Sequence, residues 1–406
     1  MHRSSFLCLL LPLTLCFEAC VAEEVKPSPR SPAFTAQDVD TQIEIGYGLA
    51  IADVQGDGKL DILLADKTQI VWYENPTWKK HIIAENLTPK DNVCIAARDI
   101  NGDGKCEIAV GAEWNPGDTV NSGAVFYLIP PADRTQKWEP VKLHHEPTVH
   151  RMKWVKREPN KYDLVVVPLH GRGNKNGEGE GVKVLAYQMP ENPKDEWKTE
   201  VISDDMHATH NFDVIRRLDD RKKEALVIGG REGLTTALWE KGKVASVHSL
   251  EHLTYKEPLP GFGEVRLGRL DPKTIFVAGI EPMHGTHLTT YPIDLTKPNN
   301  PNPERNVITD DLQDGHALAC GDLLNLGRDQ IVVGWRANAN KLAKVGIRLY
   351  MPDDATGKKW TPYVVDDNTM ACEDLVLADL NGDKKLDIIA AGRRTKNVKI
   401  YWNDSK

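Results

Sequence analysis

Short apolar runs recur along the chain, and tight loops rich in acidic residues and glycine separate them. The clearest copies are residues 51–63 (IADVQGDGKLDIL), 97–110 (ARDINGDGKCEIAV) and 378–390 (ADLNGDKKLDIIA). Each has an apolar run, a turn of Asp, Asn and Gly, and a second apolar run, which is the pattern of a β-hairpin. Weaker copies lie at residues 153–167, 215–228, 267–277 and 320–333. The sequence therefore predicts seven hairpins.

Two further short strands follow each hairpin. The third strands are expected at residues 70–73, 124–128, 182–187, 236–239, 288–291, 346–350 and 398–402. The fourth strands, several of which begin with Trp-Lys, are expected at residues 78–83, 138–143, 197–202, 243–249, 305–308 and 360–365. Four short strands repeated seven times predict an all-β fold, a seven-bladed β-propeller with four-stranded blades.

The last repeat lacks a fourth strand, because the sequence reaches residue 406 directly after its third. Residues 34–43 precede the first hairpin and have no hairpin of their own. We therefore expect residues 34–43 to supply the outer strand of the last blade and to close the ring, which leaves no sheet edge open.

Residues 1–22 have the pattern of a cleaved signal peptide. Met1–Arg3 is basic, Phe6–Phe17 is apolar but too short to span a bilayer, and small residues follow at Val21 and Ala22. The alternative is that Cys20 is a lipid-anchor cysteine. No other stretch is apolar enough to span a membrane. We expect a secreted or periplasmic protein whose residues 23–406 form one propeller domain.

Composition narrows the class of partner. Of 406 residues, 40% are hydrophobic, and 51 Lys and Arg stand against 59 Asp and Glu, a net charge of −8. This balance argues against a disordered chain and against a nucleic-acid partner, whose binding rests on a basic surface. The four cysteines beyond the leader contain no C-x-x-C pair and are too few for a disulfide scaffold.

The acidic loops of the first, second and seventh hairpins have oxygen side chains at alternate positions and a glycine at the turn. This arrangement suits a hard cation, and we expect calcium in a structural role. The expected ligands are Asp53, Asp57 and Asp61, then Asp99, Asn101, Asp103 and Glu107, then Asp379, Asn381, Asp383 and Asp387. The alternative is that these side chains only cap the backbone of the turn. The loops resemble those of FG-GAP or VCBS-type propeller repeats.

The inner strand of each blade begins near the axis, so residues at an equal offset before each hairpin loop should form a ring. About six residues before the loops stand Tyr47, Val93, His150, His210, Gly263, His316 and Glu373. Three imidazoles with a carboxylate suit Zn²⁺, and an open coordination position would make the ion a Lewis acid. We predict a zinc site at His150, His210, His316 and Glu373. A hydrogen-bonded polar channel without a metal is the alternative.

The residues just after the second strands should surround this ring. They form a polar rim with aromatic side chains, as a carbohydrate pocket requires. The predicted substrate-binding residues are Trp114, Arg231, His284, Arg336 and Arg393.

Residues 144–154 (HHEPTVHRMKW), 168–173 (PLHGRG) and 314–316 (DGH) resemble the β-propeller domain of aldos-2-ulose dehydratase. In that family the propeller carries a zinc ion at the floor of its cleft and acts on 1,5-anhydrofructose and related 2-keto sugars. The resemblance implies a zinc-dependent carbon–oxygen lyase, a dehydratase that eliminates water from a keto sugar in the axial pocket.

A neutral histidine, His170 or His287, would then remove the C3 proton of the sugar. Tyr47 or the other histidine would protonate the departing hydroxyl group. The rival prediction is a non-catalytic secreted propeller that binds glycans or proteins through the same rim. A third is elimination from a uronate polysaccharide or another keto-glycoside. Metal content separates the first two, because calcium without zinc favours a binding module and one zinc per chain favours the lyase.

Overall fold

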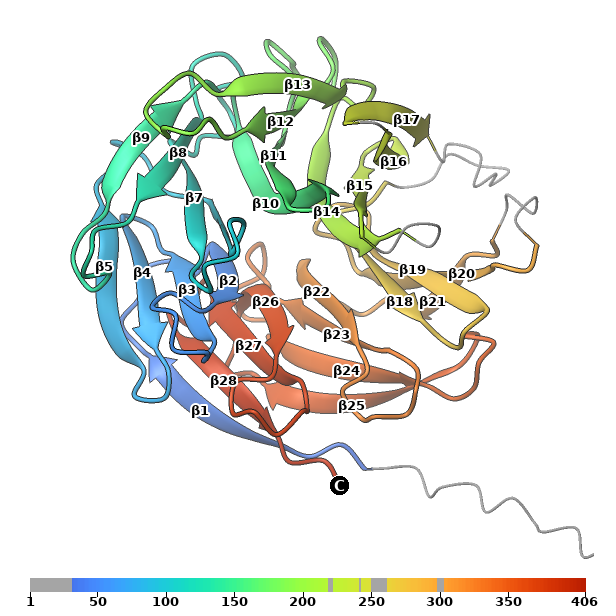
Figure 1. Ribbon diagram of the computed structural model, residues 1–406. Coiled ribbons are helices and arrows are strands. Elements are labelled where there is room, and N and C mark those ends of the chain that lie inside the picture. The colour runs from blue at the N-terminus through green and yellow to red at the C-terminus, as the bar shows by residue number, and fades with distance from the viewer. Residues whose placement is uncertain (1–30, 218–221, 241, 250–260, 298–302) are drawn as a thin grey trace, which may run out of the picture.

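The computed structural model of the chain is a ring of seven four-stranded antiparallel sheets (Figure 1). It describes residues 31–217, 222–240, 242–249, 261–297 and 303–406. The predicted signal peptide and Cys20 lie outside these residues. The described residues form 28 strands and no helix, so this part of the chain contains no helix that could cross a membrane. The predicted fold class, a seven-bladed β-propeller, is confirmed.

Blades 1 to 3 follow one another along the chain, each from its innermost to its outermost strand. Blade 1 contains β2 (Gly48–Ala52), β3 (Asp61–Ala65), β4 (Gln69–Glu74) and β5 (Lys79–Glu85). Blade 2 contains β6 (Cys94–Arg98), β7 (Glu107–Ala112), β8 (Ala124–Ile129) and β9 (Glu139–Leu143). Blade 3 contains β10 (Val149–Glu158), β11 (Lys161–Pro168), β12 (Val184–Gln188) and β13 (Lys198–Ser203).

Blades 4 to 6 repeat this order. Blade 4 contains β14 (Thr209–Arg216), β15 (Glu224–Gly230), β16 (Gly233–Glu240) and β17 (Lys243–Ser249). Blade 5 contains β18 (Glu264–Arg269), β19 (Thr274–Glu281), β20 (His287–Asp294) and β21 (Asn306–Thr309). Blade 6 contains β22 (Gly315–Gly321), β23 (Gln330–Trp335), β24 (Gly346–Pro352) and β25 (Trp360–Asp367).

Blade 7 joins the two ends of the described chain. It contains β26 (Cys372–Ala378), β27 (Asp387–Gly392), β28 (Val398–Asn403) and, as its outer strand, β1 (Phe34–Asp40). β1 pairs antiparallel with β28, from Phe34 opposite Asn403 to Asp40 opposite Val398. The indole Nε1 of Trp402 also donates to Gln37 Oε1 at 2.8 Å. The predicted closure of the ring by an N-terminal strand is confirmed.

Within the described residues, one apolar cluster lies between each pair of neighbouring blades, seven in all, and a small eighth cluster contains Ala337, Val345 and Ala371. Between blades 1 and 2, for example, Trp72 packs in one cluster with Leu128 and Trp138. Burying one large apolar side chain stabilises a fold by about 1.5–3 kcal/mol. Alternate residues of each strand face the two neighbouring blades, so the alternation in the sequence builds every interface of the ring.

The acidic hairpin loops are held together by their own side chains. Asp53 accepts hydrogen bonds from the amides of Gly56 and Gly58, at 2.6 and 2.7 Å, and Asp61 accepts one from Val54 at 2.9 Å. Gly56 and Gly58 both have φ of 81°, a conformation that favours glycine. Turn capping, the alternative role of these side chains, is therefore seen in the structure. Calcium binding at the same loops stays a prediction.

Candidate functional site

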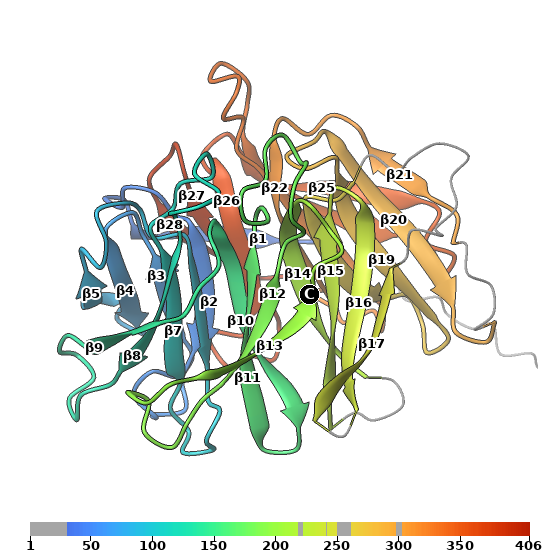
Figure 2. The ribbon, with the colours of Figure 1, turned by 90° about the horizontal axis from the view of Figure 1, so that it is seen from above.

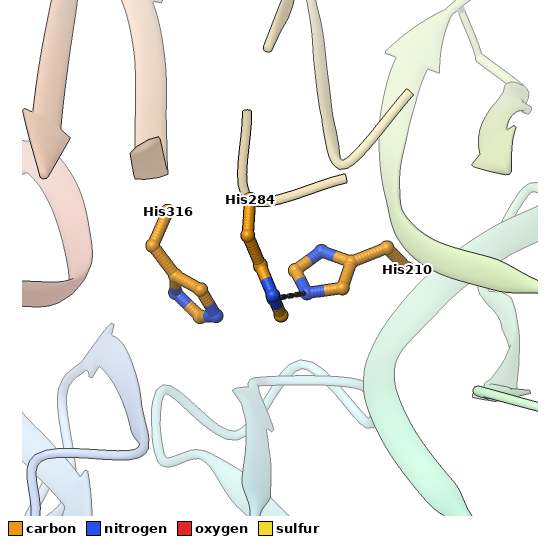
Figure 3. Close-up of side chains that lie close together, drawn as sticks. All are labelled: His210, His284 and His316. Carbon is orange, nitrogen blue, oxygen red and sulfur yellow. Dashed lines mark hydrogen bonds between the residues drawn. The ribbon is translucent and has the colours of Figure 1, made fainter. Parts of the chain in front are cut away.

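Three imidazoles meet at the axis of the ring, at the end opposite the acidic hairpins. His210 and His316 lie near the starts of the innermost strands β14 and β22. His284 comes from the loop between β19 and β20 and has a φ of 56°. One ligand nitrogen from each ring lies within 4.8 Å of those of the other two. Figure 3 shows the three rings pointing toward one another.

The turn before β20 holds His284 over the axis. The amide of Gly285 donates to the carbonyl of Pro282 at 2.7 Å, and the amide of Gly315 donates to the carbonyl of Gly285 at 3.0 Å. A Cβ on Gly285 would lie only 2.2 Å from the carbonyl oxygen of Glu281. A glycine is therefore required directly after His284. The hydrogen bond between Gly285 and Gly315, the first residue of β22, holds this turn in place.

The ring histidines are oriented by the backbone of the next blade. The Nδ1 atoms of His150, His210 and His316 donate to the carbonyls of His210, Gly263 and Glu373, at 2.8, 2.9 and 2.6 Å. In each case the acceptor is the residue at the same offset in the following blade. The residues predicted from equal offsets to surround the axis therefore lie next to one another. Because a carbonyl oxygen only accepts, each Nδ1 carries the proton and each Nε2 is an acceptor. In the absence of an ion, the Nε2 of His210 accepts from the Nε2 of His284 at 2.8 Å (Figure 3).

Burial keeps these imidazoles neutral. It holds the pKa values of His150, His210 and His316 well below the usual range, and nearby arginines lower them further. The pKa of His284 is also lowered, by desolvation first and then by repulsion from His210. His210 and His316 are buried, whereas His284 is exposed to solvent. The group therefore offers neutral nitrogen ligands at a place that a solute can reach.

His150 lies beside the group of three rather than within it. Its ring stacks on Trp114, with centroids 5.0 Å apart, and its centroid is 4.6 Å from that of His210. A guanidinium nitrogen of Arg151 lies 3.1 Å from His150 Nε2 and uses its lone pair. Among the described residues, the only group of three or more His, Cys, Asp or Glu side chains with suitably close ligand atoms is His210, His284 and His316.

Glu373, predicted as a fourth ligand, is engaged by two arginines. Arg336 donates to both carboxylate oxygens at 2.8 Å, and Arg393 donates to one of them at 2.9 Å. Arg336 also pairs with Asp314 at 3.0 Å. The side chain of Glu373 therefore holds two predicted substrate-binding residues in place, while its backbone carbonyl orients His316.

The remaining predicted residues surround the axis at different distances. Tyr47 donates to Asp91 at 2.9 Å, and Arg393 lies over its ring at 5.2 Å from the centroid. Burial raises the pKa of Tyr47, so its phenol stays protonated. His287 begins β20 and lies 3.0 Å from the hydroxyl of Thr286.

His170 and Arg231 belong to a neighbouring pocket of about 880 Å³. Its lining also includes Ala208, two positions before His210, and Met283, directly before His284, so the pocket adjoins the histidine group. Burial lowers the pKa of His170, against an opposing effect of the backbone of His207. The sequence did not predict this pocket, because loops of four blades line it and strand register does not fix the distances between such loops.

Two protein families match parts of the sequence. The family described as "Aldos-2-ulose dehydratase, beta-propeller domain" matches residues 122–293, and the family described as "FG-GAP-like repeat" matches residues 47–110. Together with the seven-bladed fold, these matches confirm the resemblance to both. No curated protein sequence matches this chain significantly.

Solved structures share the fold at low sequence identity. A chain of the mitotic checkpoint complex aligns with a TM-score of 0.55 and 12% identity over 97% of this chain and 99% of its own. A chain in the structure of BBS1N in complex with ARL6DN aligns with a TM-score of 0.53 and 13% identity over 92% and 96%. Sqt1 of Saccharomyces cerevisiae aligns with a TM-score of 0.50 and 10% identity over 93% and 99%. These likenesses show the propeller fold alone.

Proposed function

We propose that the protein is a carbon–oxygen lyase that acts on a keto sugar, with a zinc ion held by His210, His284 and His316. The observation that carries the proposal is the convergence of three neutral imidazoles at the axis, with ligand atoms within 4.8 Å of one another. The family match over residues 122–293 supports the same reaction class.

The chemistry of the three side chains fits zinc. His210 and His316 have their Nδ1 atoms anchored on backbone carbonyls, which is how zinc-ligating histidines are commonly oriented. Three protein ligands are typical of catalytic zinc, because the fourth position is left to water or substrate. A bound zinc ion would supply Lewis acidity, which polarises a ketone and acidifies the neighbouring C–H bond.

The surrounding residues supply proton transfer and orientation in this proposal. His170 is neutral at pH 7 because its pKa is lowered, so it can accept the proton from the carbon next to the ketone. The phenol of Tyr47 keeps its proton and can donate to the departing oxygen. The guanidinium of Arg393, fixed by Glu373 and partly exposed, can hold a sugar hydroxyl. His287 remains an alternative base.

Elemental analysis combined with an absorbance assay tests the proposal. We expect about one zinc per chain and an enone absorbance band when 1,5-anhydrofructose is added. His210→Ala should lose the zinc and lower kcat/KM by at least about a hundred-fold, because Lewis-acid stabilisation is worth several kcal/mol. The matched control is His144→Ala, at an exposed histidine.

Zinc and turnover retained in His210→Ala would contradict the proposal. Calcium without zinc, together with no enone formation, would favour the non-catalytic binding propeller instead.

A further inference from the structure

A preformed pocket lies beside the three histidines and is lined by loops of blades 2 to 5. Residues 116–120, from the loop between β7 and β8, and residues 174–177, from the loop between β11 and β12, form one side of it. The loops are tied together, because the amide of Gly173 donates to the carbonyl of Thr119 and the hydroxyl of Thr119 donates to the carbonyl of Asn174, both at 3.0 Å.

Arg231, from blade 4, forms a second wall and reaches across to blade 3. Its guanidinium donates to the carbonyl of Asn176 at 3.2 Å. Gly177 has a φ of 80°, and a Cβ there would lie 1.6 Å from a guanidinium nitrogen of Arg231. The glycine at this position therefore makes room for the arginine. Both walls are in place without a ligand, as is usual for small-molecule sites.

The lining combines an unpaired acceptor with apolar surface. Asn174 is only 3% exposed, and its Oδ1 has no hydrogen-bond partner. An unpaired buried acceptor is costly, and a ligand that donates a hydrogen bond removes the cost. Pro116, Val120 and Pro282 add apolar surface to the same lining. Hydroxyl donors beside apolar C–H faces are the chemistry of a sugar ring.

The pocket continues from the histidine group away from the axis. Ala208 and Met283 line it, and each lies within two positions of a histidine of the group. Its volume of about 880 Å³ lies near the upper end of the range of about 300–1,000 Å³ that is typical of sites for drug-sized ligands. A keto monosaccharide held at the histidines would leave most of this space unfilled.

We propose that this pocket binds a second ring, joined to the keto sugar by a glycosidic bond, so that the substrate is a keto glycoside. The inference rests on the proposed function, because it takes the ketone to lie at the three histidines. His170 lies in this pocket, at the junction between the two rings.

The reaction balances without a further reactant when the second ring is attached through O4 of a 2-keto sugar. The C3–H bond breaks, and its electron pair forms the C3=C4 double bond. The C4–O bond breaks, the oxygen keeps that electron pair, and it gains a proton. The products are an enone and the free second sugar in place of water.

Calorimetric binding to the metal-loaded protein tests the pocket separately from turnover. The ligands are 1,5-anhydroglucitol and 4-O-glucosyl-1,5-anhydroglucitol, in which a C2 hydroxyl replaces the ketone, so that neither can eliminate. We expect the glucosylated compound to bind at least about ten-fold more tightly, which corresponds to one or two additional net hydrogen bonds. Gly117→Phe should abolish this preference. Position 117 lines the pocket, has no positive φ, and has no atom within 3.6 Å of an added Cβ.

The matched control is Asn121→Phe, at an exposed position of the same loop that does not line the pocket. It should keep the wild-type preference. Equal affinity of the two compounds in the wild type, or equal preference in the two variants, would overturn the inference. The failure of the proposed function looks different, because then neither of the corresponding ketones, 1,5-anhydrofructose and its 4-O-glucosyl derivative, gives an enone, while the difference in binding between the two alcohols remains measurable.

Discussion

At the scale of single residues, the site depends on contacts that cross from one blade to the next. The imidazoles of His210 and His316 are aimed by backbone carbonyls of the following blade. Such contacts fix the tautomer of a histidine whatever side chain the neighbour carries. Glu373 can therefore orient His316 through its carbonyl and hold two arginines through its carboxylate at the same time.

The distinction between His284 and His150 gives the first prediction. His284→Ala should lose zinc, because it removes one of three converging nitrogens. His150→Ala should retain most of the zinc, because Arg151 already engages His150 Nε2. Metal content after dialysis measures both variants. Zinc lost from His150→Ala and kept by His284→Ala would restore the ligand set predicted from the sequence.

The second prediction concerns Arg336, which is 7% exposed and pairs with both Glu373 and Asp314. Arg336→Ala should lower the free energy of unfolding by about 3 kcal/mol, because the buried carboxylate of Glu373 keeps only Arg393 and the partly buried carboxylate of Asp314 loses its guanidinium partner. Urea unfolding measures this loss. Arg393→Ala is the comparison and should cost less, because that side chain is 28% exposed. Equal losses would contradict the ranking.

At the scale of the elements, each acidic hairpin uses two carboxylates. In the second blade, Asp99 accepts hydrogen bonds from the amides of Gly102 and Gly104, and Glu107 accepts one from Ile100. Burial raises the pKa of Glu107 to about 7, and that of Asp61 in the first blade to about 6. The second carboxylate of each of these hairpins, Glu107 or Asp61, is therefore costly to ionise when no cation is bound.

This cost predicts a pH dependence. An unfolded Glu titrates near 4.3, so between about pH 4 and pH 7 Glu107 holds its proton more tightly in the folded chain than in the unfolded chain. In EDTA, the stability of the wild type relative to Glu107→Gln should therefore fall as pH rises through this window. The buried histidines have lowered pKa values and act with the opposite sign, but they act on both proteins alike and cancel in the difference. Thermal unfolding of both proteins at several pH values measures this difference. Calcium should raise the Tm of the wild type most at pH 7, and a difference that grows with pH in EDTA would refute the argument.

At the scale of the whole molecule, the ring is held by seven similar interfaces and closed in blade 7. An apolar cluster fills each interface, so no blade is stable without its neighbours. β1 covers the edge of β28 that would otherwise offer unpaired backbone groups.

The fourth prediction follows from this closure. A chain that starts at residue 41 lacks β1 and exposes the edge of β28. We expect a lower Tm and self-association, because an open strand edge pairs with other chains. Size-exclusion chromatography and thermal unfolding measure both effects. A chain that starts at residue 31 is the control, and identical behaviour of the two would show that β1 is dispensable.

The sequence predicts the fold closely because every repeat contains the same succession of short apolar strands, and the first, second and seventh also share the acidic turn. It also predicts the ring of His150, His210 and His316, since equal offsets on equivalent strands place residues at equal heights. The sequence predicts His284 in the rim around this ring, but not its convergence with His210 and His316, because that depends on a turn after β19 rather than on strand register. The pairing of Glu373 with Arg336 could not be predicted either, since it depends on distances between blades.

In blade 7, where the ring closes, the two ends of the propeller lie side by side, so the chain could begin at a different blade. Ala33 and Ser405 are neighbours, with the amide of Ala33 3.0 Å from the hydroxyl of Ser405. A short peptide could join them, and new ends could be opened in the connection between β5 and β6. The three histidines come from blades 4, 5 and 6 and would remain within one uninterrupted stretch. Circular permutation would thus move the termini to another blade while leaving the arrangement of the three histidines unchanged.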